Sequence, residues 1–133
     1  TEHGRSGALS GLDEINLIEK GANYGWPEIE GDEKKDGMKA PIINSGPDIT
    51  WAPSGMAYLD GKLYFAGLRG EALYEATISG KSIKEIKVHL KSEYGRLRAV
   101  VTRNGYLYIS TSNRDGRGKV GEGDDKIIKM PIP

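Results

Sequence analysis

The chain has 133 residues, enough for one domain with a substantial core, and its 19 basic and 19 acidic residues cancel, so no overall charge draws it to nucleic acid or to a membrane surface. The absence of cysteine excludes disulfides, thiolate catalysis and cysteine-based zinc sites, and no apolar run is long enough to span a bilayer. The 19 glycines, seven tyrosines and short β-rich runs indicate an all-β protein.

The first part of the chain predicts loops with a few extended segments. Residues 14–18 alternate between polar and apolar side chains and predict a strand. Trp51 is expected in the core. The remaining segments are glycine-rich, charged or bounded by prolines, and they predict a loop at 1–13, a turn at 21–27, an exposed loop at 28–39 and an extended run at 41–53.

Two hairpins are predicted next, with turns that lie 44 residues apart. Asp60-Gly61 joins two strands within residues 56–67, and Asn104-Gly105 joins two strands within residues 94–118. Both dipeptides tolerate the positive φ angles of a tight hairpin turn. A spacing in the forties, with several strands in each unit, is typical of the blades of a β-propeller.

Strands predicted at 72–78 and 83–90 complete a first unit of four, whereas the second unit has one more strand, at 126–132, and lacks a fourth. The blade repeats therefore cover approximately 51–92 and 93–133. Because a propeller needs at least four blades to close, we expect this chain to be the C-terminal part of a single β-propeller domain, roughly the last two blades with a leading strand. A small open sheet that stands alone is the alternative.

Two arginines suggest a binding site at the second hairpin. Arg96 and Arg98 are two residues apart, so on a strand both guanidinium groups project from one face. Residues 112–116 form a polar, glycine-punctuated loop just past the hairpin, at the end of a sheet where function is usually found. The arrangement suits a small molecule with several negative charges, although a solvated strand edge would have the same pattern.

Five short motifs, which follow one another along the chain, together resemble the soluble quinoprotein sugar dehydrogenases. These are the PQQ-dependent aldose and glucose dehydrogenases. The resemblance implies a six-bladed propeller of four-stranded blades. It also implies oxidation of aldose sugars to lactones by hydride transfer to a quinone that Ca²⁺ activates, with PQQ and Ca²⁺ as cofactors. The motifs are Glu2-His3-Gly4, residues 13–18, residues 21–27, residues 95–98 and residues 111–118.

The resemblance also implies which residues bind the cofactors. PQQ carries three carboxylates, which arginine is suited to bind. The residues that match the PQQ pocket, or adjoin it, are Arg69, Arg96, Arg98, His3 and Asn113. For Ca²⁺, the Gly4 and Arg5 carbonyls stand where the family has a Gly-Pro pair, and a structural Ca²⁺ site is matched by the Glu14 side chain and the Tyr24 carbonyl.

No catalytic base is expected in this chain. The family takes the C1 hydroxyl proton with a histidine from an earlier blade, and the histidines here are His3, beside the metal loop, and His89, which we expect on the surface. The chain alone is therefore expected to be inactive. Its expected partners are an aldose, the remaining blades and an external electron acceptor. No signal peptide is visible, and the resemblance implies a periplasmic or extracellular protein.

Two other functions have to be weighed. A propeller could keep the fold without the cofactor and act as a binding module. It could also be a lactonase-type hydrolase, but such enzymes surround a central metal with carboxylates and Asn, whereas this chain offers arginines. The acidic residues of the last loop suggest an EF-hand only superficially, because the required spacing is absent. A solvated loop explains them better; they are Asp115, Glu122, Asp124 and Asp125.

Overall fold

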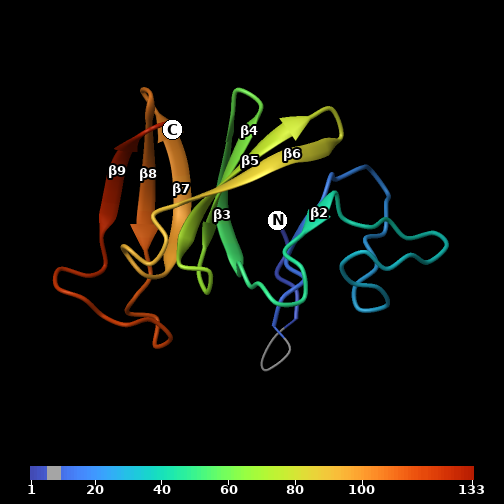
Figure 1. Ribbon diagram of the computed structural model, residues 1–133, viewed down its shortest axis with the longest axis horizontal. Coiled ribbons are helices and arrows are strands. Elements are labelled where there is room, and N and C mark those ends of the chain that lie inside the picture. Colours follow the sequence, from blue (N-terminus) through green and yellow to red (C-terminus); the bar gives the residue numbers. More distant parts are fainter. Residues whose placement is uncertain (6–9) are drawn as a thin grey trace.

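The computed structural model describes residues 1–5 and 10–133, so residues 6–9 of the loop predicted at 1–13 lie outside the described residues. The described part contains three antiparallel sheets and no helix, and hence no helix that could cross a membrane (Figure 1). The strands are β1 (Glu14–Ile15), β2 (Ile43–Asn44), β3 (Pro53–Leu59), β4 (Lys62–Gly67), β5 (Ala72–Ser79), β6 (Ser82–His89), β7 (Leu97–Arg103), β8 (Tyr106–Thr111) and β9 (Ile127–Pro131).

The strand predicted at residues 14–18 is wrong beyond its first two residues, because β1 is only two residues long and pairs with β2. The hydroxyl of Tyr24 donates to the carbonyl of Leu17 at 2.6 Å and accepts from the amide of Glu19 at 2.7 Å. These bonds hold the chain after β1 in an irregular path. Leu17 is also 39% exposed, so the alternation in the sequence does not mark a buried face here.

Each of the two larger sheets contains one of the predicted hairpins. Strands β3, β4, β5 and β6 form one sheet in chain order, and among the described residues β7, β8 and β9 form a three-stranded sheet. The two hairpin turns have nearly the same conformation. The φ angles are 47° and 78° at Asp60 and Gly61, and 51° and 77° at Asn104 and Gly105.

The first strands of the two sheets approach each other closely at Gly55. A Cβ atom at this position would lie 2.8 Å from the Ala99 Cα and 2.8 Å from the Arg98 carbonyl oxygen. Both strands are irregular near this point, with register shifts between Pro53 and Met56 and between Leu97 and Ala99. The contact fixes the start of β7, which carries Arg98 and directly follows Arg96, against the neighbouring sheet.

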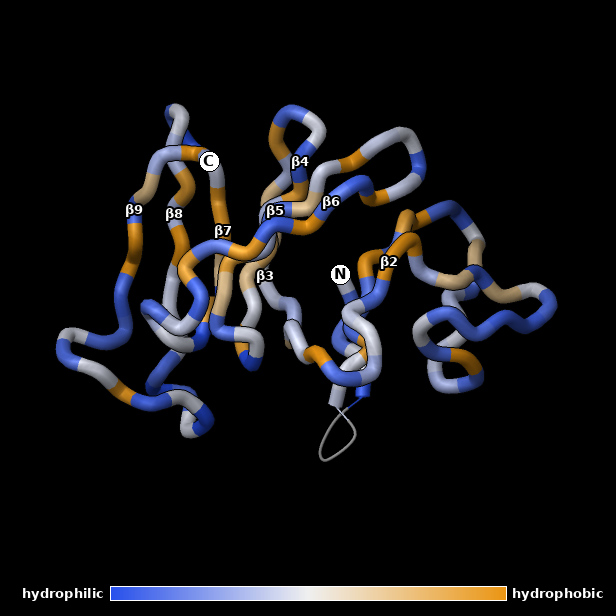
Figure 2. Tube along the Cα trace, viewed as in Figure 1, coloured by the Kyte–Doolittle hydropathy of each residue, from blue (hydrophilic) through white to orange (hydrophobic). Residues whose placement is uncertain are grey.

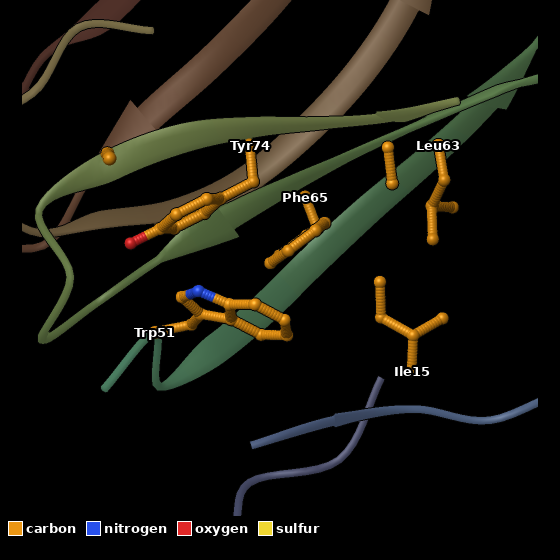
Figure 3. Packing of buried hydrophobic residues seen from close by; sticks show 7 residues of the cluster. Ile15, Trp51, Leu63, Phe65 and Tyr74 are labelled. Atoms are coloured by element: carbon orange, nitrogen blue, oxygen red, sulfur yellow. The ribbon is translucent and has the colours of Figure 1, made fainter. Parts of the chain in front are cut away.

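Apolar side chains pack on both faces of the four-stranded sheet, and Figure 2 shows hydrophobic segments along the strands of both larger sheets. Trp51 is buried as predicted, with its ring centroid 5.4 Å from Phe65 and 5.7 Å from Tyr74 (Figure 3). The opposite face packs against the three-stranded sheet. The buried residues of that second cluster are Tyr64, Ala66, Leu73, Leu97, Val100, Leu107 and Ile109.

The outer face of the three-stranded sheet is open in the described structure. Val101, Tyr106 and Ile127 are 57%, 37% and 78% exposed there, and the Lys129 ammonium lies 4.0 Å from the centre of the Tyr106 ring. Within the described residues β9 pairs only with β8, which leaves its other edge unpaired. A sheet with an unpaired edge and apolar side chains on its open face can accept a further strand or blade.

A buried carboxylate ties together three strands of the four-stranded sheet, and the side chain of His89, expected on the surface, is 24% exposed and contacts it. Glu75 of β5 is 2% exposed; it pairs with Lys62 of β4 at 2.6 Å and with the Nε2 of His89 of β6 at 2.8 Å. Burial alone raises the pKa of Glu75, but the hydrogen bonds from Lys62 and His89 outweigh this and leave the pKa below its ordinary value.

Replacing Glu75 with glutamine should destabilise the complete protein by about 1–3 kcal/mol at neutral pH. The depressed pKa means that the carboxylate contributes stability above its unfolded pKa, near 4.3, and that this contribution is lost as the pH falls through the folded pKa. The difference in unfolding free energy between the parent and Glu75→Gln, measured with urea, should therefore shrink below about pH 4. Glu85→Gln, on the exposed part of β6, is the matched control. A difference in unfolding free energy between the parent and Glu75→Gln that does not change with pH would contradict the ion pair.

Candidate functional site

Three loops meet at the end of the larger sheets opposite the hairpin turns, at the lower end in Figure 1. They connect β4 to β5 (residues 68–71), β6 to β7 (residues 90–96) and β8 to β9 (residues 112–126). Backbone hydrogen bonds join them: the Ser92 amide donates to the Glu71 carbonyl at 2.8 Å, and the Ser112 amide donates to the Arg96 carbonyl at 2.8 Å. All the predicted PQQ-pocket residues outside the N-terminal segment lie on these loops or at the start of β7.

Arg96 and Arg98 reach the same carboxylate. The Nε and Nη2 atoms of Arg96 lie 3.0 and 2.8 Å from Oδ2 of Asp115, and the Nη2 of Arg98 lies 3.4 Å from the same oxygen. Arg98 also donates from Nε to the Ser112 hydroxyl at 3.0 Å. The structure thus brings the two guanidinium groups together, as the two-residue spacing predicts, although Arg96 lies just before β7 and not on it.

The two arginines differ in exposure. The Arg96 side chain is 9% exposed, whereas that of Arg98 is 51% exposed. The hydrogen bonds from Arg96 and from the Arg117 amide hold the pKa of Asp115 well below its usual range, so the acid stays ionised. Arg96 is therefore largely neutralised inside the protein, and Arg98 is the member of the pair that solvent can reach.

Asn113 connects the loops that surround the arginines. Its Oδ1 accepts from the Arg96 amide at 2.9 Å, and its Nδ2 donates to the Tyr94 carbonyl at 2.9 Å and to Oδ2 of Asp124 at 3.0 Å. The side chain is buried, and these bonds engage both of its polar atoms. Asn113, predicted to contact the cofactor, thus fixes the backbone of Arg96 in this structure.

Gly95 allows this packing, and an alanine there should disrupt it. The φ angle is +71°, and a Cβ atom would lie 2.4 Å from Oδ1 of Asn113. Gly105→Ala is a matched control, because Gly105 has φ +77° and no atom within 4 Å of the added methyl group. The control should cost about 1–2 kcal/mol for the left-handed backbone, and Gly95→Ala should cost clearly more. Equal unfolding free energies of the two variants would show that the close approach of Gly95 to Asn113 does not contribute to stability.

Arg69 lies at the same end, exposed on the turn between β4 and β5. Its turn is anchored by two backbone hydrogen bonds, from the Gly70 amide to the Trp51 carbonyl and from the Leu68 amide to the Ala52 carbonyl, both at 3.0 Å. Tyr74 packs under Gly70, and its burial raises the pKa of its phenol to about 12. The turn is thus a rigid support for Arg69.

The N-terminal segment joins this end through Asp13, which sequence reasoning did not single out. Asp13 is fully buried; its Oδ1 accepts from the Gly4 amide at 2.8 Å, and its Oδ2 accepts from the Trp51 and Ala52 amides at 2.6 and 2.9 Å. His3 lies beside it, with Nδ1 3.5 Å from Oδ1 of Asp13. Asp13 stands next to turn residues, and no sequence pattern reveals that an acid in this place accepts hydrogen bonds from distant backbone amides.

The residues predicted to bind Ca²⁺ have protein partners in this structure. The carbonyl of Gly4 lies 3.1 Å from His3 Nδ1, and the side chain of Arg5 forms an ion pair with Glu30. Glu14 is buried, which raises its pKa, and its Oε1 accepts from the Gly31 amide at 2.9 Å. The hydroxyl of Tyr24 is used by the backbone of residues 17 and 19, as described above.

Two acidic residues at the end of the last loop serve as internal hydrogen-bond acceptors. Asp124 accepts from the Gly121 amide at 2.6 Å, and Asp125 accepts from the Asn113 amide at 2.6 Å and from the Thr111 hydroxyl at 3.1 Å. Within residues 1–5 and 10–133, no group of three or more His, Cys, Asp or Glu side chains could hold a metal ion.

A cavity of about 280 Å³ opens beside the same loops. Tyr94, Asn113, Lys119, Asp124 and Lys126 are among the residues that line it, together with Glu71 and Glu93. None of the three predicted cofactor arginines lines this cavity. The arginine cluster and the cavity are therefore neighbouring but separate features.

The comparisons with known proteins give one family. The model of the glucose/sorbosone dehydrogenase family matches residues 1–122. Aldose sugar dehydrogenase YliI of Escherichia coli K12 is 32% identical over 86% of this chain. The PQQ-bound form of an aldose sugar dehydrogenase from Streptomyces coelicolor is 42% identical over 88% of this chain, with a TM-score of 0.80.

A protein from Thermus thermophilus described as a putative oxidoreductase (glucose dehydrogenase) is 41% identical over 96% of the chain, with a TM-score of 0.86. The chain covers 35%, 35% and 39% of these three proteins, in the order given, so it spans about a third of the length of its curated relative. Its solved relatives are β-propellers, and the chain forms part of one. It therefore belongs to the glucose/sorbosone dehydrogenase family.

Proposed function

We propose that the complete protein is a PQQ- and Ca²⁺-dependent aldose dehydrogenase, which oxidises aldose sugars to lactones, and that this chain supplies part of the cofactor pocket. The observation that carries the proposal is the convergence of Arg96 and Arg98 at one end of the sheets, in a family with a PQQ-bound relative 42% identical to this chain.

The residues at this end suit a ligand with several carboxylates. Arg98 is half exposed and anchored at Nε by Ser112, so its remaining guanidinium edge is available for the paired hydrogen bonds that arginine makes with a carboxylate. Arg69 adds a second cation on an anchored turn, and His3 lies on the N-terminal segment, 45% exposed. The donor set therefore fits PQQ.

The oxygen atoms needed for Ca²⁺ are also present. A carbonyl oxygen has two lone pairs, so the Gly4 carbonyl can bind a cation while it accepts from His3. The Arg5 carbonyl and, at the structural site, the Glu14 carboxylate and the Tyr24 carbonyl complete the proposed ligands. All are hard oxygen donors, the type that Ca²⁺ prefers.

When bound, PQQ and Ca²⁺ would supply a polarised quinone able to accept a hydride from C1 of the sugar. This chain's own contribution would be to bind and orient the cofactor through Arg98 and Arg69. His89 is bound to Glu75 between strands, and His3 lies beside Asp13. We propose that the base is a histidine in another part of the protein.

The proposal includes further blades and an external electron acceptor. The exposed side chains of Val101, Tyr106 and Ile127 and the unpaired edge of β9 support a contact with another blade. We also propose a periplasmic or extracellular location, on the family resemblance alone.

The test is reconstitution of the complete protein. Apoprotein stripped of metal should reduce an artificial electron acceptor in the presence of an aldose only after both PQQ and Ca²⁺ have been added. Either cofactor alone should leave dye reduction at background. Background rates with both present, in protein that is folded by circular dichroism, would contradict the proposal and favour the binding module. Lactone hydrolysis without PQQ would favour the hydrolase.

A further inference from the structure

A carboxylate lies inside the cationic cluster that is proposed to bind an anionic cofactor. Oδ2 of Asp115 contacts Arg96 at 2.8 and 3.0 Å, the Ser112 hydroxyl at 3.3 Å and Arg98 at 3.4 Å, and its Oδ1 accepts from the Arg117 amide at 2.9 Å. The Asp115 side chain is only 20% exposed. A negative charge at this place needs an explanation, because by charge alone it opposes binding of a tricarboxylate.

We propose that Asp115 is a positioning residue of the PQQ site, which holds Arg96 and Arg98 in one arrangement so that Arg98 presents its free edge to a cofactor carboxylate. The inference rests on the proposed function. It assigns the two arginines different tasks: Arg96 fixes Asp115, and Arg98 contacts the ligand.

The geometry supports this division. Arg96 uses Nε and Nη2, one full edge of its guanidinium group, on a single oxygen of Asp115, so that edge cannot bind a ligand at the same time. Arg98 is bound at Nε by Ser112 and makes only a long contact with Asp115. Ser112 in turn donates to Asp115, so the serine and the acid together fix the orientation of Arg98.

Preorganisation explains why a negative charge is tolerated here. Two neighbouring guanidinium groups repel each other, and a free arginine samples many rotamers that a ligand would have to restrict. One ionised carboxylate between Arg96 and Arg98 removes most of that repulsion and fixes both side chains before the ligand arrives. The cluster keeps a net charge of one positive unit, counting Arg96, Arg98 and Asp115.

The alternative, that Asp115 merely competes with the ligand for the arginines, makes the opposite prediction. If Asp115 is a competitor, its removal lowers the Kd for PQQ, because a repulsive charge disappears. If it is a positioning residue, its removal raises the Kd although the site becomes more positive. The sign of the change therefore decides between the two roles.

The experiment is an equilibrium titration of PQQ, followed by its absorbance spectrum, into Ca²⁺-loaded apoprotein of the complete protein. We expect Asp115→Ala to raise the Kd about tenfold or more, and Asp115→Asn, which keeps one acceptor oxygen, to raise it less. The loss should appear mainly in the Kd for PQQ and to a smaller extent in kcat at saturating PQQ. Asp36→Asn removes a negative charge from the exposed loop at 28–39 and should bind PQQ like the parent.

Two further variants keep the result decisive. Arg96→Ala combined with Asp115→Ala should be no weaker than the poorer single variant, since both act through one contact. If Asp115→Ala does not fold, Asp115→Asn carries the test alone. A Kd equal to or below the parent value in the folded Asp115 variants overturns the inference but not the proposed function, whereas a parent protein that does not bind PQQ overturns both.

Discussion

Replacing Arg98 with alanine is expected to raise the Kd of the complete protein for PQQ between roughly tenfold and more than a hundredfold. The change removes one charge-assisted contact with a cofactor carboxylate, worth about 1.5–3 kcal/mol in total. Thermal unfolding should barely change, because the side chain is half exposed and makes only polar contacts at the sheet end. Titration of PQQ into apoprotein measures the effect.

Arg96→Ala should behave differently although it lies only two positions away. It should also weaken PQQ binding, but in addition it should lower the unfolding temperature, because the Arg96 side chain is 9% exposed and removal leaves Asp115 without its main partner. Arg98→Lys should bind PQQ more tightly than Arg98→Ala but more weakly than the parent, because an ammonium keeps the charge but cannot form the paired contact of a guanidinium.

Arg103→Ala is the control for both arginine variants, because Arg103 is exposed at the opposite end of β7. It should bind PQQ as the parent does. If Arg98→Ala matches this control, PQQ does not bind beside Arg98. Equal loss of stability in Arg96→Ala and Arg98→Ala would contradict the separate tasks of the two arginines.

Trp51→Ala is expected to cost about 3–5 kcal/mol of unfolding free energy, the usual cost of removing a buried aromatic side chain. Trp51 is 6% exposed and packs on Phe65 and Tyr74, whose rings stack with centroids 4.8 Å apart (Figure 3). The loss is large against the roughly 5–15 kcal/mol that typically separates folded from unfolded domains.

Trp26→Ala is the control, because this tryptophan is 61% exposed and its removal should change stability by no more than about 0.5 kcal/mol. Denaturant unfolding of both variants gives the comparison. If Trp51→Ala does not fold, Trp51→Phe, expected to cost about 1–2 kcal/mol, replaces it. Equal stability of the Trp51 and Trp26 variants would mean that the core is placed wrongly.

The parts of the fold that local chemistry determines could be predicted from the sequence. Asp60-Gly61 and Asn104-Gly105 suit the same tight turn wherever they occur, so both hairpins and their spacing were evident and are confirmed. Trp51 was evident for a similar reason, as a large aromatic residue beside a strand-rich segment. The blade boundaries at 51–92 and 93–133 and the roles of the site residues remain predictions.

Long-range contacts account for what the sequence did not reveal. The spacing of Arg96 and Arg98 indicated a shared face, but their different burial depends on Asp115, which lies in another loop. The pairing of His89 with Glu75 depends on strand register and on a neighbouring sheet that covers the carboxylate. Period-two alternation failed after β1, because side-chain to backbone bonds from one tyrosine decide the path there.

The most direct measurement is a crystal structure of the complete protein with PQQ and Ca²⁺ bound. We expect a PQQ carboxylate within hydrogen-bond distance of the Arg98 guanidinium group and near the turn that carries Arg69, with Arg96 still bound to Asp115. Cofactor density at any other part of the molecule, with Arg98 turned to solvent, would contradict the placement of the site.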